Sequence, residues 1–555
     1  MDSFVKKAIA LLNSGRISDS ISFIRQRLVA DRNSRGLDTI SRIESTYGFM
    51  LDFMAKGVAD PGRDKLYSDI CEDLYSLVRS IEQDSLVKDS GQLFYSQVRT
   101  IKYSGLTFSD ALGRYLSCDS SLQLTEVDSP DFQKISAEKD RSLKDIFAVV
   151  WTLPIGETDT LREIARVAAS EDIPYQLRAE LVSALILNLL NVYDRDKLMA
   201  LLDIEVKCVS EKIRARALMG IILVLNRYRN RIRYDYALSL RFQAWTDTED
   251  NYDRIREVVF ALVKARGGKH LAHKVENEIL PDIISYGPDF MNKMKDKDGN
   301  ISLQSIEENP EWEKMMNESG LDKKLRKLHS IQEDGGDLML SSFTHLSENF
   351  FFKDIDSWFR PFELWDASRL GIKKEFLNIL EVILVNPAMC DCDKYAVTLN
   401  LTRMRSPMRD MMSESMKAQN DEAREELKEM MLHTKSTDFV EEANNFARVL
   451  YRFFNYFRLK GEFQNPFDEA LDITEIPFIQ DYLSSEEILT SVSDFYLRQE
   501  FYSDAIASYD LLAKKDPINR SLYDQKRGYC YEKSGDLRKA FDCYSAAASI
   551  ESDDE

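Results

Sequence analysis

Apolar residues recur three and four positions apart along most of this chain, and short polar turns separate the apolar segments. This spacing places the apolar residues on one face of a helix. Near the C-terminus the pattern repeats with a shift of 35 residues, which predicts two helical hairpins in succession. The matched large and small positions are Tyr496 and Tyr531, Ala505 and Ala540, and Tyr509 and Tyr544.

This order of large and small residues resembles the tetratricopeptide repeat, in which two helices pair and each pair stacks on the next. The resemblance implies a surface that binds other proteins. One mode of binding, the carboxylate clamp for chaperone tails, needs Lys, Asn and Arg along the first helices. The corresponding face is acidic to neutral here, so that mode is excluded. It carries Glu487, Thr490, Asp494, Leu522, Gln525 and Tyr529.

A second repeat occupies the middle of the chain. The segment from Leu177 to Leu189 aligns with that from Ile213 to Leu225 at a shift of 36 residues, and a weaker third copy starts at Ile255. Each copy is a strongly apolar helix after a more polar one, so its apolar face needs a neighbour to cover it. Stacked pairs of this kind look like HEAT or armadillo repeats. The alternative is an unrelated helical bundle with accidental spacing.

The N-terminal region predicts a further hairpin with Gly15 at its turn. It is either a degenerate copy of the terminal repeat or an ordinary α-hairpin. Amphipathic helices follow, and then a loop rich in Ser and Asp. The predicted hairpin helices are Ala8–Asn13 and Ser18–Asp31, the later helices are Leu37–Met54, Arg63–Ile81 and Leu93–Leu116, and the loop is Asp119–Pro130.

Composition favours an all-α fold. The 555 residues include only 21 Gly and 13 Pro, and helix formers such as Leu, Ala, Glu and Lys dominate. Single cores stop growing near ~250–300 residues, so we expect an α-solenoid of several units. We divide the chain into N-terminal hairpins (1–125), HEAT-like repeats (126–285), an acidic linker (286–320), an aromatic-rich helical region (321–470) and the terminal repeats (471–555).

A net charge of −20 favours solubility and disfavours general binding to nucleic acid. The chain opens with an acid at position 2 and no apolar core, unlike a signal peptide. Its longest apolar run, Met219 to Leu225, is far shorter than the ~20 residues that span a bilayer. Seven cysteines are too sparse for a disulfide framework and fit a reducing compartment. We therefore expect a cytoplasmic protein without membrane contact.

Four arginines form a cluster directly after the strongest apolar helix. They would lie near its C-terminus, where cations are favoured by ~0.3–1 kcal/mol. Arginine also pairs well with carboxylate and phosphate. The cluster is therefore a structural or solvated loop, a site for an acidic protein, or a site for RNA or another polyanion. Its members are Arg227, Arg229, Arg231 and Arg233.

Eight aromatic residues crowd the stretch from Phe343 to Trp365. Each ring carries roughly 150–250 Å² of surface, so leaving all of them in water would far exceed the apolar patch that a monomer normally shows. Most must be buried, either at a junction between domains or under a partner. The eight are Phe343, Phe350, Phe351, Phe352, Trp358, Phe359, Phe362 and Trp365.

Two motifs suggest cation or nucleotide binding, and each lacks a necessary residue. A calcium loop at Asp296–Glu307 has Ile301 where the backbone needs Gly. The run Gly267-Gly268-Lys269 lacks the first Gly and the Ser or Thr of a phosphate loop, so we expect it to end a helix. Both motifs are better explained as ordinary turns or helix ends.

Possible metal ligands are equally incomplete. His270, His273 and Glu276 share a helix face but lack a fourth zinc ligand. Cys390 and Cys392 flank a turn that is explained more simply if Asp393 is the N-cap of a helix. Because no nucleophile–base signature stands out among the residues, we expect no metal, no cofactor and no catalytic residue. A hydrolase with an acidic site that carries no signature stays an alternative.

The chain from Glu311-Trp312 onward resembles a family of bacterial tetratricopeptide proteins to which no activity is assigned. The resemblance rests on four phrases and implies a helical-repeat protein in the cytoplasm. The phrases are Asn309-Pro310-Glu311-Trp312, Ser357-Trp358-Phe359-Arg360-Pro361-Phe362, Cys390-Asp391-Cys392-Asp393-Lys394-Tyr395 and Leu450-Tyr451-Arg452-Phe453-Phe454.

Together these features predict a non-enzymatic scaffold or adaptor for protein–protein interaction. The alternatives are an adaptor that binds RNA or another polyanion through its arginines, and the acidic hydrolase. We expect the last helix to end at Ile550 and to leave the open face of the final repeat partly uncovered. The predicted partner-binding residues are Tyr496, Tyr529, Tyr531, Tyr544 and Ile550, together with the four arginines.

Overall fold

The computed structural model describes residues 3–126, 129–233, 235–246, 249–274, 349–370, 372, 389–403, 438–468 and 471–553. Within these ranges every regular element is helical, which confirms the all-α class. No helix there combines the length and the apolar character that crossing a bilayer requires. The calcium-loop segment Asp296–Glu307 and the linker 286–320 lie outside the described residues.

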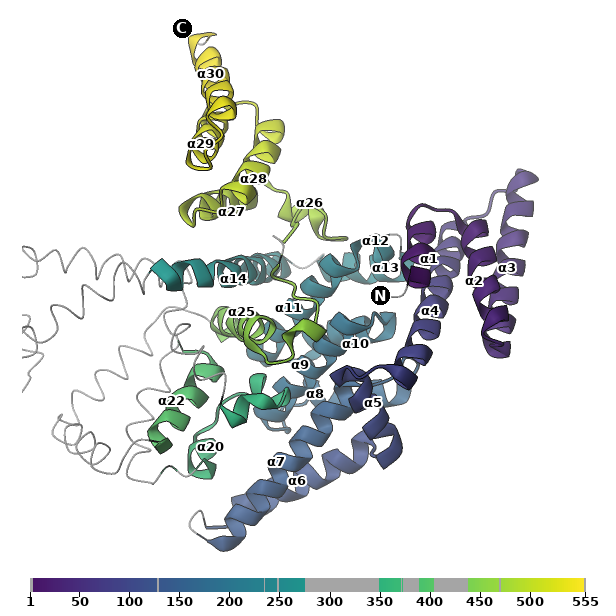
Figure 1. Cartoon of the computed structure of the whole chain (residues 1–555), viewed down its shortest axis with the longest axis vertical. Helices are drawn as coiled ribbons and strands as arrows, with labels where there is room; N and C mark the ends of the chain where they lie inside the picture. The colour runs from purple at the N-terminus through teal and green to yellow at the C-terminus, as the bar shows by residue number, and fades with distance from the viewer. Residues whose placement is uncertain are drawn as a thin grey trace, which may run out of the picture.

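Four N-terminal helices form a unit with its own core. Figure 1 shows them in purple along one side of the molecule. Apolar residues from Phe4 to Ile81 make this core, separate from the main one. The predicted hairpin and the two helices after it are confirmed. They are α1 (Ser3–Asn13), α2 (Ile17–Ala30), α3 (Ser34–Ala55) and α4 (Arg63–Asp89).

The predicted single helix Leu93–Leu116 is wrong, because the structure divides it into α5 (Leu93–Ser104) and α6 (Phe108–Gln123). Gly105 ends α5 with φ of 64°, the left-handed conformation that glycine adopts without strain. Because α6 continues to Gln123, the loop also begins later than Asp119. Both helices pack in the main core and not in the N-terminal one, so 125 is not the edge of the smaller unit.

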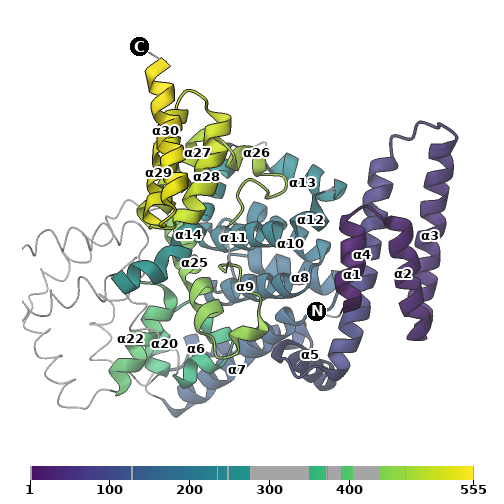
Figure 2. The ribbon, with the colours of Figure 1, turned by 45° about the horizontal axis from the view of Figure 1, so that its top comes forward.

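The middle of the chain is a stack of helical hairpins, as the 36-residue shift predicts. The first helices α8 and α10 pack together, and the second helices α9, α11 and α14 form a neighbouring layer beside them (Figure 2). Before them, α7 (Pro130–Trp151) packs on α6 and α9. The hairpins are α8 (Thr158–Ala169) with α9 (Tyr175–Asn191), α10 (Arg195–Lys207) with α11 (Glu211–Arg227), and α13 (Tyr236–Thr246) with α14 (Glu249–Lys274).

Segments from later in the chain cover the layer of second helices. Helix α25 (Asp438–Tyr456) packs along α11 and α14, and residues 349–370 pack against α7. As a result nearly every residue of α9 is buried. The covering elements also include η2 (Phe350–Lys353), η3 (Asp356–Trp358), α20 (Leu364–Arg369) and α22 (Asp391–Arg403).

The terminal hairpins project from the body and end the chain in yellow in Figure 1. Gly267 and Gly268 lie inside α14, so the helix stop expected there is wrong. A Cβ at Gly267 would lie 3.5 Å from the ring of Phe501 and 3.6 Å from that of Phe495. These are ordinary van der Waals distances, and they show that the first terminal hairpin packs directly on α14. The terminal helices are α26 (Gln480–Leu483), α27 (Glu486–Arg498), α28 (Tyr502–Lys515), α29 (Arg520–Lys533) and α30 (Leu537–Asp553).

A close contact of α9 with α11 gives a test of this packing. A Cβ added at Gly220 would lie 2.3 Å from the Ile186 side chain, so we expect Gly220→Leu to lower the free energy of unfolding by about 1–3 kcal/mol through overpacking. Gly113, on the exposed side of α6, has nothing within 4 Å of its added Cβ. Gly113→Ala should be neutral or stabilise by up to about 1 kcal/mol. Thermal unfolding of both variants checks this, and equal shifts would contradict it.

Candidate functional site

The terminal hairpins divide the predicted partner-binding tyrosines into two groups. Tyr496 belongs to the core of α27 and is only 4% exposed, so its prediction as a binding residue is wrong. Its ring instead packs edge-on against Phe501. Tyr529 and Tyr544 remain accessible, with 44% and 37% of their surface exposed. Tyr531 and Ile550 are intermediate in burial.

The accessible tyrosines line a hollow of about 470 Å³ that α29 and α30 border together with Leu497 of α27. Leu522 and Tyr529 contribute its α29 side, and Tyr544 and Ala547 contribute its α30 side. Two large apolar residues on α30 are more exposed still: Leu537 at 68% and Phe541 at 71%. Sequence reasoning missed both, although the 35-residue shift pairs them with Tyr502 and Ile506.

Polar contacts hold the tyrosines of this surface in place. The Tyr544 hydroxyl donates a hydrogen bond to Glu532 at 2.9 Å. Partial burial and this hydrogen bond raise the pKa of Tyr544 to about 12, so the phenol keeps its proton at neutral pH. Tyr544 also lies on Gly528, where an added Cβ would come within 2.7 Å of the ring. The hollow therefore has one ordered aromatic wall with a carboxylate beside it.

The most buried member of the arginine cluster is a structural residue. Arg231, in the short helix α12 (Arg229–Ile232), donates two hydrogen bonds to Glu72 of α4, at 2.5 and 3.0 Å. Its guanidinium also lies 4.2 Å from the ring centroid of Tyr193 and 5.1 Å from that of Tyr75. This arginine joins the N-terminal unit to the hairpin stack.

The other three arginines also make contacts within the chain. Arg227 donates to the carbonyl of Gln464 at 3.4 Å, and Arg229 donates to Asn226 at 3.3 Å. Arg233 forms an exposed ion pair with Glu475. The cluster therefore joins several segments of the molecule, which is the structural alternative of the sequence analysis.

Most aromatic side chains of this stretch that the structure describes form a junction between distant segments. Phe352, Trp358 and Phe359 are buried, and Phe359 stacks on Phe147 of α7. Phe351 and Phe362 pack on Tyr395, whereas Phe350 is largely exposed. Phe343 and the side chain of Trp365 lie outside the described residues.

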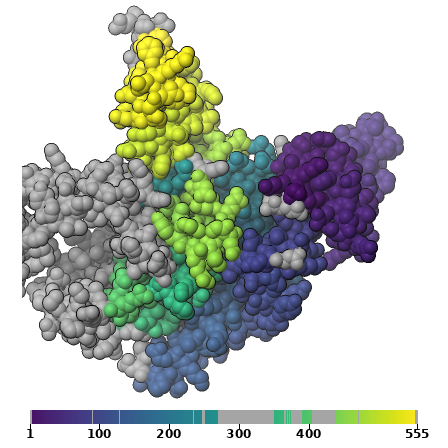
Figure 3. Space-filling view, viewed as in Figure 1, coloured from purple at the N-terminus to yellow at the C-terminus, as the bar shows by residue number. Residues whose placement is uncertain are grey.

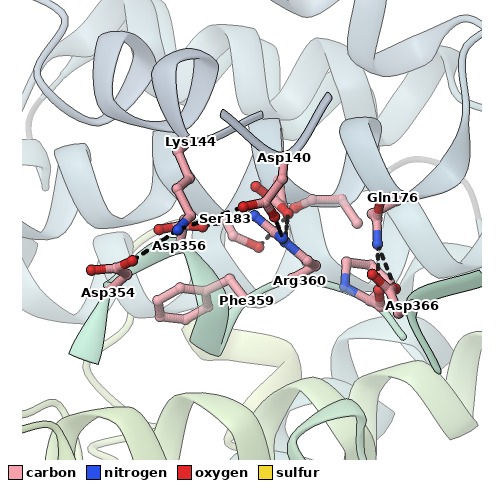
Figure 4. Close-up of polar contacts among 12 residues, drawn as sticks. Asp140, Lys144, Gln176, Ser183, Asp354, Asp356, Phe359, Arg360 and Asp366 are labelled. Carbon is pink, nitrogen blue, oxygen red and sulfur yellow. Dashed lines mark hydrogen bonds and ion pairs between the residues drawn. The ribbon is translucent and has the colours of Figure 1, made fainter. Parts of the chain in front are cut away.

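Beside these rings lies a buried charge cluster centred on Arg360 (Figure 4). The guanidinium is 1% exposed and binds three carboxylates, those of Glu180 at 2.9 Å, Asp356 at 2.8 Å and Asp140. Asp140 lies on α7 and Glu180 on α9, so the contact holds the segment around residue 360 against the stack. Sequence reasoning included Arg360 only within a resemblance phrase, because no local pattern reveals its distant partners.

The carboxylates of this cluster titrate differently. Burial raises the pKa of Glu180 well above its usual value in spite of Arg360, and burial also raises the pKa of Asp356. Burial acts in the same direction on Asp140, but Arg360 and Arg369 outweigh it and lower the pKa of that carboxyl. Glu180 and Asp356 therefore retain protons at a pH where exposed carboxylates have lost them.

Two further buried arginines extend the contacts to the later helices. Arg216 of α11 donates to Glu442 of α25 at 2.5 Å and to Asp391 of α22 at 3.2 Å. Arg452 of α25 donates to Asp393 at 2.7 Å. Asp393 is not the N-cap that we predicted. Helix α22 starts at Asp391, and the Asp393 side chain accepts from the backbone N–H of Cys390.

Arg360 fills the space between its three carboxylates. Five surface hollows in the described part of the chain are lined by other residues. No group of three His, Cys, Asp or Glu side chains among the described residues has the arrangement of a metal site. Nothing is described of the side chains of His270 and His273, and Glu276 lies outside the described residues.

Two arginines of the cluster, Arg231 and Arg233, allow a test of its structural role with a matched control. The Arg231 and Glu72 side chains are only 7% and 15% exposed, so Arg231→Ala should cost about 3–5 kcal/mol by leaving a buried charge unpaired. Arg233→Ala breaks an exposed pair and should cost less than about 1 kcal/mol. Calorimetry measures the free energy of unfolding of both variants, and limited proteolysis measures how readily the α4–α5 connection is cleaved in each. A similar effect of the two substitutions would contradict the structural role of Arg231.

The raised pKa of Glu180 predicts a pH dependence of stability. The folded protein holds this proton more tightly than the unfolded chain, so the contribution is complete below the usual pKa of 4.5 and is lost as pH rises through the raised value. Glu180→Gln stays neutral. We expect the melting temperature of the variant to rise relative to the wild type as the pH is raised above the usual pKa of 4.5. Glu138→Gln, at the surface of α7, is the matched control.

Comparison with known proteins adds no identification. No family model, curated protein or solved structure matches this chain. The resemblance to bacterial tetratricopeptide proteins is thus supported by the sequence phrases alone, and the function must be argued from the surface that the fold leaves open.

Proposed function

We propose that this protein is a non-enzymatic helical-repeat scaffold of the cytoplasm that binds another protein through its terminal hairpins. The observation that carries the proposal is the group of large apolar side chains exposed together on the last two helices. A soluble monomer seldom leaves such a patch uncovered without a binding role. The group comprises Leu522, Tyr529, Leu537, Phe541 and Tyr544.

The position of these hairpins supports the same conclusion. Figure 3 shows them in yellow, standing out from the body of the molecule. In a helical-repeat protein the layer of second helices could also serve as a binding surface. Here α25 packs on that layer and covers it, and Glu442 of α25 pairs with the buried Arg216. The terminal surface is therefore the better candidate for a partner.

Its composition also suits a protein partner. Aromatic rings with a polar tip, such as Tyr529 and Tyr544, bury a large area while keeping a hydrogen-bonding group, and they are enriched where proteins meet. The adjacent Glu532 and Lys526 supply charges at the edge. Neither alternative function has comparable support. Arg227, Arg231 and Arg233 contact distant parts of this chain, and the carboxylates around Arg360 line none of the five hollows described above.

Affinity purification with mass spectrometry tests the proposal. We compare the full chain with a chain that ends at Ser485, and we expect specific partners to be lost from the shorter chain. The full chain carrying Arg227→Ala and Arg233→Ala is the matched control and should retain them. Circular dichroism establishes that the shorter chain is folded. Partners that bind the shorter chain equally well would contradict the role of the hairpins, and capture that falls steeply with salt and needs the arginines would favour a polyanion.

A further inference from the structure

Four residues on the outer side of α28 have equivalents on α30, and the two sets differ in burial. In the first hairpin Tyr509 is fully buried, while Tyr502, Ile506 and Ala513 are partly buried against the core. All four equivalent residues in the second hairpin are exposed. They are Leu537 for Tyr502, Phe541 for Ile506, Tyr544 for Tyr509 and Ala548 for Ala513.

Helix α29 packs along α28 and covers Tyr509. Its Tyr523 stacks on Tyr509, with ring centroids 6.3 Å apart and an interplanar angle of 24°. One turn later on α29, Lys526 lies 5.3 Å from the centroid of the Tyr509 ring. The lysine also donates to Asp494 of α27 at 2.6 Å, and the same carboxylate oxygen accepts from the Tyr509 hydroxyl at 2.5 Å. An aromatic ring and a cation on one helix thus complete the first hairpin.

The second hairpin presents matching features around the hollow of about 470 Å³. Its walls include Gln525, Tyr529, Tyr544 and Ala547, which correspond to Thr490, Asp494, Tyr509 and Leu512 around α29. A carboxylate again accepts from the tyrosine hydroxyl, here Glu532. A carboxylate can accept several hydrogen bonds, so Glu532 can pair with a cation as Asp494 does.

We propose that this hollow binds an amphipathic helix of a partner protein, and that the helix takes the place that α29 takes on the first hairpin. The partner helix carries an aromatic residue that stacks on Tyr544, and a Lys or Arg within the next two turns that pairs with Glu532. Its apolar face covers Leu537 and Phe541. The binding mode is that of a helix in a groove, read through side chains about one turn apart.

The proposal rests on the proposed function and adds the chemistry of the partner. Charge complementarity at Glu532 and continuity with the α28–α29 packing both favour a basic amphipathic helix. The carboxylate of the second hairpin lies three residues further along α29 than its counterpart lies along α27. Tyr529 is equivalent to Asp494, and Glu532 is equivalent to Leu497. The cation of the partner is therefore expected further along its helix than Lys526 is along α29.

A fluorescent peptide with the sequence of residues 516–535, which contains α29, is the probe. Binding to the full chain is followed by fluorescence anisotropy up to about 1 mM, because isolated helices of this length form poorly and bind weakly. We expect saturable binding that Phe541→Glu weakens at least about tenfold, since it places a charge against an apolar face. Phe541 is largely exposed, so the variant should fold normally. Phe49→Glu, at another exposed phenylalanine on α3, should bind like the wild type.

A double-mutant cycle tests the ion pair. Glu532→Gln keeps an acceptor for the Tyr544 hydroxyl while removing the charge, and the peptide carries Tyr529→Lys, which places a cation three residues beyond Lys526. We expect the peptide change to tighten binding to the wild-type chain and to have little effect once Glu532 is replaced. Independent effects of the two changes would overturn the assignment of Glu532.

Three results would overturn the inference as a whole. One is the absence of peptide binding. Another is binding that Phe541→Glu leaves unchanged, because the peptide would then have replaced α29 on α28. The third is self-association of the full chain that Phe541→Glu abolishes, which assigns the surface to a second copy. If partners are lost from the chain ending at Ser485 while the peptide does not bind, the proposed function stands and only this inference fails.

Discussion

A single buried guanidinium joins the parts of this protein that are far apart in sequence. Arg360 connects its own segment to α7 and α9 through Asp140 and Glu180. Removing a buried charge from water costs several kcal/mol, and its partners return this only when geometry and hydrogen bonding are good. The arrangement therefore selects one docking position for residues 349–370, which an apolar contact alone would define less strictly. Arg216 and Arg452 do the same for α22 and α25.

The positions of α25 and residues 349–370 determine which surfaces of the molecule stay open to a partner. Because α25 packs on α11 and α14, the layer of second helices belongs to the interior of the protein. The arginines after α11 are likewise committed to contacts with α4 and with residues 464 and 475. The end of the terminal hairpins takes no part in these contacts, and its aromatic side chains stay accessible.

Local sequence features predicted most helices but failed where a neighbour changes their meaning. Gly267 and Gly268 predict a helix stop, yet α14 continues through them to Lys274 and packs against α25 and α27. Asp393 read as an N-cap, yet it lies inside the first turn, where it also pairs with Arg452. Gly105 did break a helix as glycine often does, within a segment whose apolar spacing is continuous.

The sequence by itself determined the helical class, the two repeat periods and the pairing of large and small positions, because these depend on residues close together in the chain. Tertiary structure alone decided which of two equivalent tyrosines is buried. Tyr509 and Tyr544 occupy the same place in their hairpins, but only Tyr509 is covered by a following helix. Burial depends on neighbours in space, and Glu180, which binds Arg360, and Glu72, which binds Arg231, each lie more than a hundred residues from their arginine.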